Sequence, residues 1–295
     1  MNKLKVFRYV FAFFVVVGGL YYVFYGVEFS EILNSLAGIN PFFIILFYFV
    51  QIVITFLLSL RWKMIIAEKN VDIGYLESFR FYMITFFFNI FLPARAGDFY
   101  RGYITSDHDF IDSSFLIMKE KLFDLILIAL IFSILALSLF GEFSGYVFII
   151  GLVVFGGLTA ITFLFKVEKI PFLNHYYEKI RKSFLEIFKT DKTIKFFLIT
   201  VLIWSLEVLE ASLLFYALGV DISLFLITFI TFSWSLLSAI PISPAGLGST
   251  DAAVLFILVS SGIFRPDAVS FVVSYRGLLV LFSILLGGYF YINEL

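Results

Sequence analysis

The sequence predicts an all-α polytopic membrane protein with six spanning helices and two broken, re-entrant helical hairpins, arranged as an inverted-topology repeat. The chain is 62% hydrophobic and only 15% charged, whereas soluble domains are nearer half apolar and a quarter charged. Apolar runs of about 18 residues or more recur along it, which is the length that a helix needs to cross a bilayer. The matching order of elements in the two halves predicts the repeat.

Six apolar stretches are long enough to span the membrane. We expect these helices near 7–27, 41–60, 118–140, 146–165, 196–218 and 268–290. The first follows a basic start and resembles a signal peptide. Its apolar run is too long and no small-residue cleavage site follows, so we interpret it as a retained helix.

Lys and Arg set the predicted orientation. They precede the first helix, follow the second and crowd 166–195, whereas the loops at 28–40, 141–145 and 219–223 contain neither. Because basic loops stay cytoplasmic, we predict a multi-pass protein of the cell membrane with a cytoplasmic N-terminus. The basic segment 166–195 also carries an apolar helical stripe, which favours an interfacial helix on the inner leaflet over an ordinary loop.

Two further apolar stretches, 80–106 and 224–262, are interrupted by Pro and Gly. The flanks of the first lie on the predicted cytoplasmic side, so we expect it to dip into the membrane and return. The second should do the same from outside, although its length leaves open whether it crosses fully.

The single membrane domain 1–295 then divides into two repeats of opposite orientation, 1–140 and 141–295. Each has the order helix, helix, broken segment, helix. Such repeats are typical of transporters, whose substrate site lies near the membrane midplane. Ordinary loops that contain Pro and Gly are the alternative.

The first broken segment holds the motif "NIFLPARAGDFYR". The polypeptide breaks at Pro93 and Gly97, and Asn89 can cap exposed backbone groups. Free N–H groups at a helix break attract anions, and arginines suit phosphate. We therefore predict a phosphate or phospholipid head-group site, with Arg95 and Arg101 as donors and Asp98 holding one arginine. An interfacial helix end with snorkelling arginines is the alternative.

Three other groups of residues are candidates for the translocation path. Glu120 and Asp124 share a helix face and are expected to compensate Arg95 and Arg101, or to form a solvated helix start. In "PISPAGLGSTDAAV", we select Ser243, Gly246, Gly248 and Asp251 as a second broken site rather than a tight external turn.

The third group lies deep in predicted spans. Glu207 is about 16 Å into its helix and Arg276 about 12 Å into the last one, and Glu210 follows Glu207 on the same side. A charge at the bilayer centre costs roughly 2.5–3.5 kcal/mol on insertion scales. We therefore expect these groups to face inward, with Glu207 or Glu210 paired to Arg276. A structural ion pair is the alternative to a substrate or proton path.

The motifs "NIFLPARAGDFYR", "EKLFD", "WSLE", "PISPAGLGSTD" and "YRGL" occur in that order. Over nearly its whole length the chain resembles the lysylphosphatidylglycerol synthase transmembrane-region family. In bacterial multiple peptide resistance factors, the similar module resembles a flippase for aminoacylated phospholipid, and a separate soluble domain makes that lipid. Some archaeal dolichyl-phosphate mannose synthases carry a similar module. The resemblance implies lipid translocation by a stand-alone module, and the many Phe, Ile and Lys residues suggest an archaeal source.

We therefore expect a flippase or transporter for a phospholipid or a polyprenyl-phosphate-linked lipid. The alternatives are an intramembrane lipid-modifying enzyme and a partner module for a separately encoded lipid synthase or glycosyltransferase. We expect no catalytic residues, no cofactor, no metal and no nucleic-acid partner. The expected partners are a lipid with a phosphate head group, a soluble lipid-synthesising enzyme and a second copy in a homo-oligomer.

Overall fold

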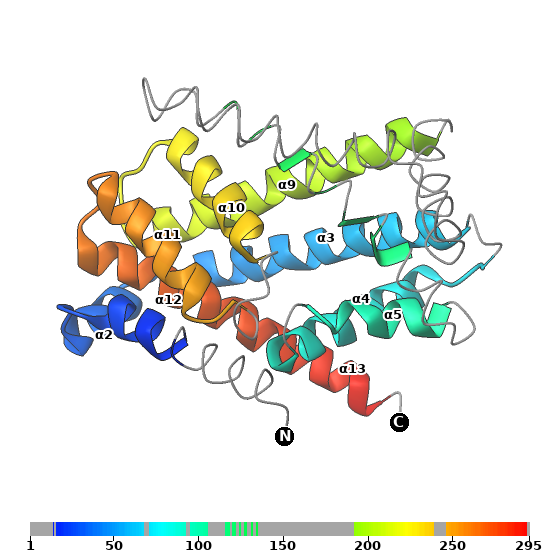
Figure 1. The fold of residues 1–295 in the computed structure, drawn as a ribbon, viewed down its shortest axis with the longest axis horizontal. Helices are drawn as coiled ribbons and strands as arrows, with labels where there is room; N and C mark the ends of the chain where they lie inside the picture. Colours follow the sequence, from blue (N-terminus) through cyan, green and yellow to red (C-terminus); the bar gives the residue numbers. More distant parts are fainter. Residues whose placement is uncertain are drawn as a thin grey trace, which may run out of the picture. The chain divides into compact units, whose positions relative to one another are not determined.

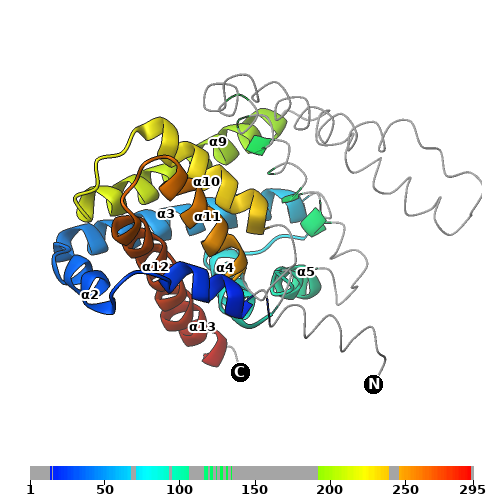
Figure 2. The ribbon, with the colours of Figure 1, turned by 60° about the vertical axis from the view of Figure 1, so that its left-hand side comes forward.

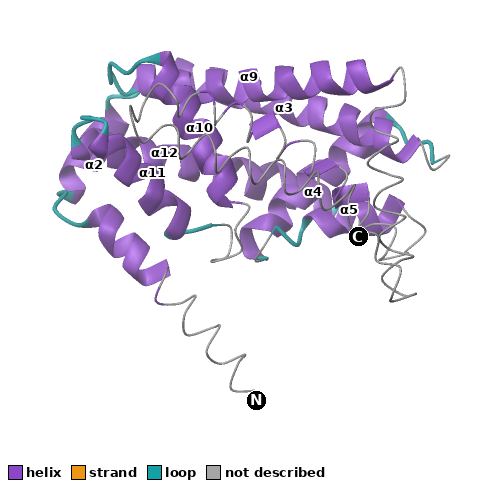
Figure 3. Cartoon of the chain, turned by 45° about the horizontal axis from the view of Figure 1, so that its top comes forward, coloured by secondary structure: helices purple, strands orange, loops and turns teal. Residues whose placement is uncertain are grey.

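The computed structural model describes residues 14, 16–67, 71–92, 95–105, 116–118, 120, 121, 124, 127, 128, 131, 134, 192–238 and 246–293. These residues form helices joined by turns, and no strand occurs among them, as Figures 1 and 3 show. This confirms the predicted all-α class for the described part. The chain divides into one compact unit of Met1–Leu60, Ile73–Arg101 and Ile203–Leu295, and another of Arg61–Asp72 and Gly102–Leu202.

Three helical segments are long and apolar enough to cross a membrane: Pro41–Ile66, Ile194–Ala217 and Arg265–Ile292. They comprise α3 (Pro41–Ile66), α9 (Lys192–Ala217), and the run of α12 (Arg265–Phe282), a π-helical turn (Ser283–Gly287) and α13 (Gly288–Ile292). Each covers about 36 Å or more at about 1.5 Å per residue. The predicted spans at 41–60, 196–218 and 268–290 are confirmed.

The other three predicted spans are not tested in full. Of 7–27, residues 14 and 16–24 are described and helical. Of 118–140, scattered residues are described and helical, and 146–165 lies outside the described residues, as does nearly all of the predicted interfacial segment. Six spans and the inverted repeat therefore stay predictions.

The α3 helix has an outward apolar stripe and a more polar buried face. Its exposed large side chains recur every three or four residues, at Phe42, Ile45, Phe49, Ile52 and Phe56. The opposite face buries Gln51, Thr55 and Ser59. In a water-soluble protein the apolar face would be buried and the polar face exposed. A membrane-spanning helix instead turns its apolar face to lipid and its polar groups inward.

One predicted loop is wrong in its structure. Residues 28–40, expected as an external loop, contain the helix α2 (Phe29–Ala37). Its start is capped because the Glu28 backbone N–H donates to the Glu31 carboxylate at 3.2 Å, and α2 packs against α12. A helix of nine residues shows too few turns for its apolar period to stand out in the sequence.

The first broken segment consists of two helices separated by a break, as predicted, whereas its return to the face from which it enters the membrane stays a prediction. The helices α4 (Tyr75–Phe91) and α5 (Asp98–Thr105) are separated by residues 92–97. The Tyr100 ring lies 5.4 Å from that of Phe88 and 6.4 Å from that of Phe81. The start of α5 therefore folds back along α4.

The second broken segment has the same design. The helices α10 (Leu224–Ser238) and α11 (Ser249–Ser260) pack against each other, and α11 also packs against α12; Figure 2 shows these helices together. Gly246 and Gly248 have φ of 70° and 75°, the left-handed region that glycine adopts at low cost. Residues 239–245 lie outside the described residues.

Candidate functional site

In the first unit, the buried polar groups of the spanning helices meet at Glu210 of α9. This side chain is 0% exposed. The Tyr275 hydroxyl of α12 donates to Glu210 Oε2 at 3.3 Å. The Gln51 amide of α3, in the orientation that satisfies both groups, donates to Oε1 at 2.9 Å and to Oε2 at 3.2 Å. Three helices thus place one carboxyl between two neutral donors, and we call these residues the Glu210 cluster.

A second buried group lies at the break between α10 and α11. Arg276 of α12 donates to Asp251 Oδ1 through Nε at 3.0 Å and Nη2 at 2.6 Å, and through Nη2 to the Thr250 hydroxyl at 2.8 Å. The other carboxylate oxygen, Oδ2, accepts from the Gly248 N–H at 3.0 Å. Asp251 therefore caps the start of α11 and holds Arg276, and we call this the Arg276 cluster.

The two clusters adjoin through α12 and α10. Tyr275 and Arg276 are consecutive in sequence, and the Trp234 ring lies 5.1 Å from the Tyr275 ring and 5.2 Å from the Arg276 guanidinium carbon. Polar side chains of α3, α9, α11 and α12 therefore form a connected group within apolar helices.

The geometry adds a partner of Arg276 that the sequence did not indicate. Asp251 forms an ion pair with Arg276, whereas Glu210, one of the two expected partners, accepts from Tyr275 and Gln51. A pairing of Arg276 with Glu207 stays a prediction. Asp251 reaches Arg276 because the glycine turn at 246–248 is followed by the first turn of α11, which packs against α12. Glu207 is half-buried one turn before Glu210.

The glycine turn is also a packing site for the N-terminal helical residues. A side-chain carbon on Gly248 would lie 2.7 Å from the Val16 carbonyl oxygen, and one on Gly19 would meet the Gly248 backbone. At the other end of this segment, Arg265 donates to the carbonyls of Tyr22 and Tyr25. The close contact between the two backbones explains why glycine occupies both position 19 and position 248.

The first break contains a different arrangement of the same residue types. The Asn89 amide donates to Asp98 Oδ1 at 3.1 Å, and Arg101 Nη2 lies 4.0 Å from that oxygen. The Arg101 guanidinium carbon also lies 4.1 Å from the centre of the Tyr82 ring. Asp98 thus lies within ion-pair distance of one arginine, Arg101, and its role in holding that arginine stays a prediction. Asn89 supports Asp98, in place of the backbone capping that we expected.

The two arginines of this break have different surroundings. Arg101 is 0% exposed, so it does not offer an open phosphate contact in this conformation. Arg95 is exposed and has φ of 54°, the left-handed region that a non-glycine residue adopts at a cost. Of the two predicted phosphate donors, Arg95 is therefore the exposed one in this structure. Gly97 is buried, and a side chain there would lie 2.6 Å from Asn89 Oδ1.

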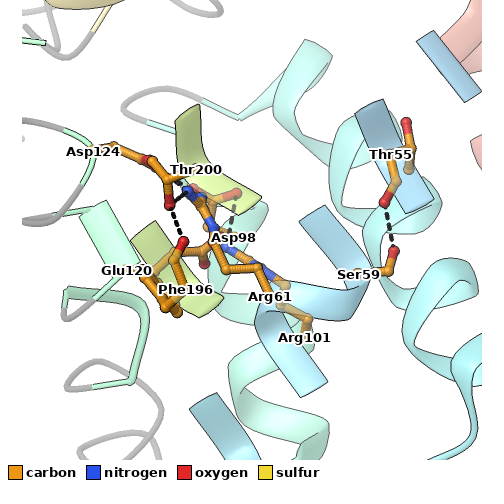
Figure 4. Close-up of polar contacts among 9 residues, drawn as sticks. All are labelled: Thr55, Ser59, Arg61, Asp98, Arg101, Glu120, Asp124, Phe196 and Thr200. Carbon is orange, nitrogen blue, oxygen red and sulfur yellow. Dashed lines mark hydrogen bonds and ion pairs between the residues drawn. The ribbon is translucent and has the colours of Figure 1, made fainter. Parts of the chain in front are cut away.

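The second unit contains a buried ion-pair cluster around Arg61 (Figure 4). Arg61 Nη2 donates to Glu120 Oε1 at 2.8 Å, and Nη1 donates to Asp124 Oδ1 at 2.5 Å. A second bond joins Nη2 to Asp124 Oδ2 at 2.8 Å, so this pair is bidentate. Nη1 also donates to the Thr200 hydroxyl at 3.3 Å, and the Phe196 ring centre lies 5.5 Å from the guanidinium carbon.

The Arg61 cluster supplies a cation that the sequence did not indicate. Glu120 and Asp124 share a helix face, as expected, and Arg61 binds both. Their compensation of Arg95 and Arg101 stays a prediction. We had interpreted Arg61 as one of the basic residues after the second span. The signal that could have found it is the polar face of α3, where Gln51, Thr55 and Ser59 point inward before it.

Two predicted site residues, Pro93 and Ser243, lie outside the described residues. In the described part of the chain, no group of three or more His, Cys, Asp or Glu side chains could hold a metal ion.

Comparison with known proteins agrees with this set of motifs. Residues 9–287 match the model of the family described as the lysylphosphatidylglycerol synthase TM region. The chain belongs to this family. The predicted resemblance is thereby confirmed, and the chain is a membrane protein with several apolar spanning segments.

Two archaeal relatives of this family member are also membrane proteins. It is 31% identical over 222 residues to a UPF0104 membrane protein of Methanocaldococcus jannaschii, covering 70% of this chain and 94% of the relative. It is 22% identical over 272 residues to a UPF0104 membrane protein of Methanothermobacter thermautotrophicus, covering 79% and 80%. No solved structure matches the chain.

Proposed function

We propose that this protein moves a lipid with a phosphate head group, either a phospholipid or a polyprenyl-phosphate-linked lipid, between the two leaflets of the cell membrane. The Arg276 cluster is the observation that carries the proposal. It places a cation, a carboxylate and a helix start at a glycine-rich break, in contact with a spanning helix. Charges inside membrane helices are costly and mark substrate or ion paths.

The Arg276 side chain is 19% exposed, whereas that of Asp251 is 6% exposed. The arginine is therefore partly accessible while its counter-ion stays covered. Asp251 accepts both hydrogen bonds from the Arg276 guanidinium on one oxygen, Oδ1. A phosphate could instead accept them on two oxygens, which is the bidentate contact that a planar guanidinium favours. We infer that a lipid phosphate competes with Asp251 for Arg276 during passage.

Arg95 supplies the entrance contact in this proposal. It is exposed at the first break, in a strained backbone conformation that folded proteins tend to keep at functional positions. In the predicted orientation the break is open to the cytoplasmic leaflet. The lipid tails stay in the hydrocarbon while the head group follows the polar side chains.

The inverted repeat is part of the proposal, and two similarities between the clusters support it. In each repeat, a carboxylate lies in the first turn of the second half-helix, after a glycine-containing turn, at Asp98 and at Asp251. The Arg61 and Glu210 clusters also draw on α3, on α9 and on the helix that follows each break. Paired broken helices around a polar site are the arrangement of many transporters.

A reconstitution assay tests the function. The purified chain in liposomes should accelerate the exchange of a fluorescent phospholipid or polyprenyl phosphate between leaflets, measured with a membrane-impermeant quencher. Arg276→Gln should slow the exchange, whereas Arg80→Gln, which changes an exposed arginine of α4, should not. Failure of the wild-type chain to move any anionic or zwitterionic lipid would contradict the proposal.

The family description names a synthase, which favours a second role as membrane partner of a separately encoded lipid-synthesising enzyme. The two roles are compatible, because the enzyme's product would be the lipid that this protein moves. Co-purification of such an enzyme with the tagged chain tests the association. Formation of a new lipid by the purified chain alone would instead support an intramembrane enzyme.

A further inference from the structure

We propose that Glu210 is a proton-binding site whose proton uptake and release drive or regulate lipid movement. The coupling half of this inference rests on the proposed function, whereas the proton site itself does not.

The surroundings of Glu210 favour a neutral side chain. It is buried in the spanning helix α9, and in the described part of the chain its hydrogen-bond partners are an amide and a hydroxyl. An ionised carboxylate in such surroundings is costly unless a cation pairs with it. A proton removes that cost.

The neighbouring charges support the same assignment. Glu207 lies one turn earlier on the same helix and adds like charge. The nearest cation on α12, Arg276, has Asp251 of α11 as its ion-pair partner. Among the described residues, the two that hydrogen-bond to Glu210, Gln51 of α3 and Tyr275 of α12, are neutral, as is Trp234 of α10, which packs on Tyr275.

The Gln51 amide can serve both protonation states. With its nitrogen toward Glu210, it donates to the carboxylate at 2.9 and 3.2 Å. Turned over by half a revolution, it presents its carbonyl oxygen at the same place, where the O–H of the protonated acid donates to it. Tyr275 can donate to the acid or the carboxylate, so neither state leaves the carboxyl without a partner.

The proton step is a simple exchange. A proton from water at one membrane face forms the O–H bond on the Glu210 carboxylate, and the amide of Gln51 turns to accept it. On release, that bond breaks, the proton passes to water at the other face, and the amide turns back. A change of charge beside the Arg276 cluster would alter how strongly a lipid phosphate competes there.

Infrared difference spectroscopy of the full chain in lipid nanodiscs, between acidic and alkaline buffers, tests the proton site. A carboxylic acid has a carbonyl stretch that its carboxylate lacks. The wild-type chain should show such a band, lost in alkaline buffer, and Glu210→Gln should abolish it. This variant keeps the size and hydrogen bonds of the side chain, so it should fold.

Glu77→Gln is the matched control. Glu77 is an exposed glutamate at the third position of α4, where its carboxylate accepts from the Gly74 N–H, and Gln caps a helix there equally well. The band should persist in this variant. If the band survives Glu210→Gln, or if Glu210 shows no protonated form in any buffer, the proton site is refuted.

Lipid exchange in liposomes under an imposed proton gradient tests the coupling. The gradient should change the wild-type rate, and the rate of Glu210→Gln should be the same with and without it. An intact Glu210 band with no lipid movement by the wild type would refute the proposed function and leave the proton site standing. An intact band with wild-type movement that ignores the gradient would refute the coupling.

Discussion

Arg276 and Asp251, 25 positions apart in the sequence, are joined by two hydrogen bonds to a single carboxylate oxygen, at 3.0 and 2.6 Å. The pair joins the last spanning helix to the first turn of α11. Asp251 uses its other oxygen to cap that turn through the Gly248 N–H. The Asp251 side chain therefore fixes both the helix start and the position of the partly buried cation.

Removing one member of this pair should destabilise the protein strongly. Arg276→Leu leaves Asp251 buried without its cation, which costs about 3–5 kcal/mol in comparable buried pairs. Thermal unfolding in detergent should show the loss. The double variant Arg276→Leu with Asp251→Leu should recover part of the stability, because the unpaired charge of Asp251 is removed as well, while lipid exchange stays impaired. Full exchange activity in the folded double variant would contradict the role of Arg276 in lipid contact.

The Arg61 cluster provides a comparison between buried and exposed ion pairs on one helix. Arg61→Gln leaves Glu120 and Asp124 together without their cation and should lower the free energy of unfolding by about 3–5 kcal/mol. Two residues along, Lys63 pairs with Asp72, whose side chain is 92% exposed. Lys63→Gln should therefore cost less than about 1 kcal/mol. Equal losses from the two variants, by chemical or thermal unfolding, would show that Arg61 is not the residue that neutralises the two acids.

The structure also explains which parts of the fold could be predicted from the sequence. The spans at α3, α9 and the C-terminal helices follow from apolar composition alone, because lipid requires long uninterrupted apolar helices. The breaks follow from Pro and Gly, and the helix–turn–helix at each break is local in sequence. The helix α2 was missed because it depends on a cap and on packing against α12, neither of which has a long sequence pattern.

The site was less predictable, because its pairings are long-range. Composition and depth show that Arg276 and Glu210 must face inward, but not which partner each meets. The sequence favoured a glutamate of α9 for Arg276 and did not point to Asp251, which the turn at 246–248 places against α12. Arg61 was missed because it lies near the end of an apolar run, where snorkelling toward water is the usual behaviour of arginine.

Substitutions at Gly248 and Gly262 distinguish the cost of lost packing from the cost of backbone strain. Both have positive φ, 75° and 89°, so Ala is strained at either position by about 1 kcal/mol. Only Gly248 has a neighbour in the way, the Val16 carbonyl oxygen at 2.7 Å from the added carbon, whereas Gly262 faces open space. Gly248→Ala should therefore lower the melting temperature more than Gly262→Ala. Equal shifts would show that the N-terminal segment does not pack closely on this turn.

Arg95 should show a conflict between stability and function. Its φ of 54° suits glycine, so Arg95→Gly should stabilise the fold by about 1 kcal/mol and slow the exchange of anionic lipids. Arg80→Gly, an exposed arginine inside the helix α4, should instead destabilise it by about 1 kcal/mol and leave exchange per folded molecule unchanged. Unfolding and liposome exchange measured on the same preparations decide both points. Wild-type exchange by Arg95→Gly would remove Arg95 from the proposed entrance.

The predicted orientation can be measured directly, because the chain contains no cysteine. Asp72→Cys changes an exposed residue after α3, and Asp221→Cys and Ser261→Cys change exposed residues on either side of the α10–α11 hairpin. In sealed cells, a membrane-impermeant maleimide should label the cysteines at 221 and 261 and should label position 72 only after the membrane is opened. This result follows if basic loops are cytoplasmic and if the hairpin returns to the face from which it entered. Labelling of positions 221 and 261 from opposite faces would instead mean that 224–262 crosses the membrane. The second break would then not be re-entrant, and the repeat would not contain two matching re-entrant hairpins.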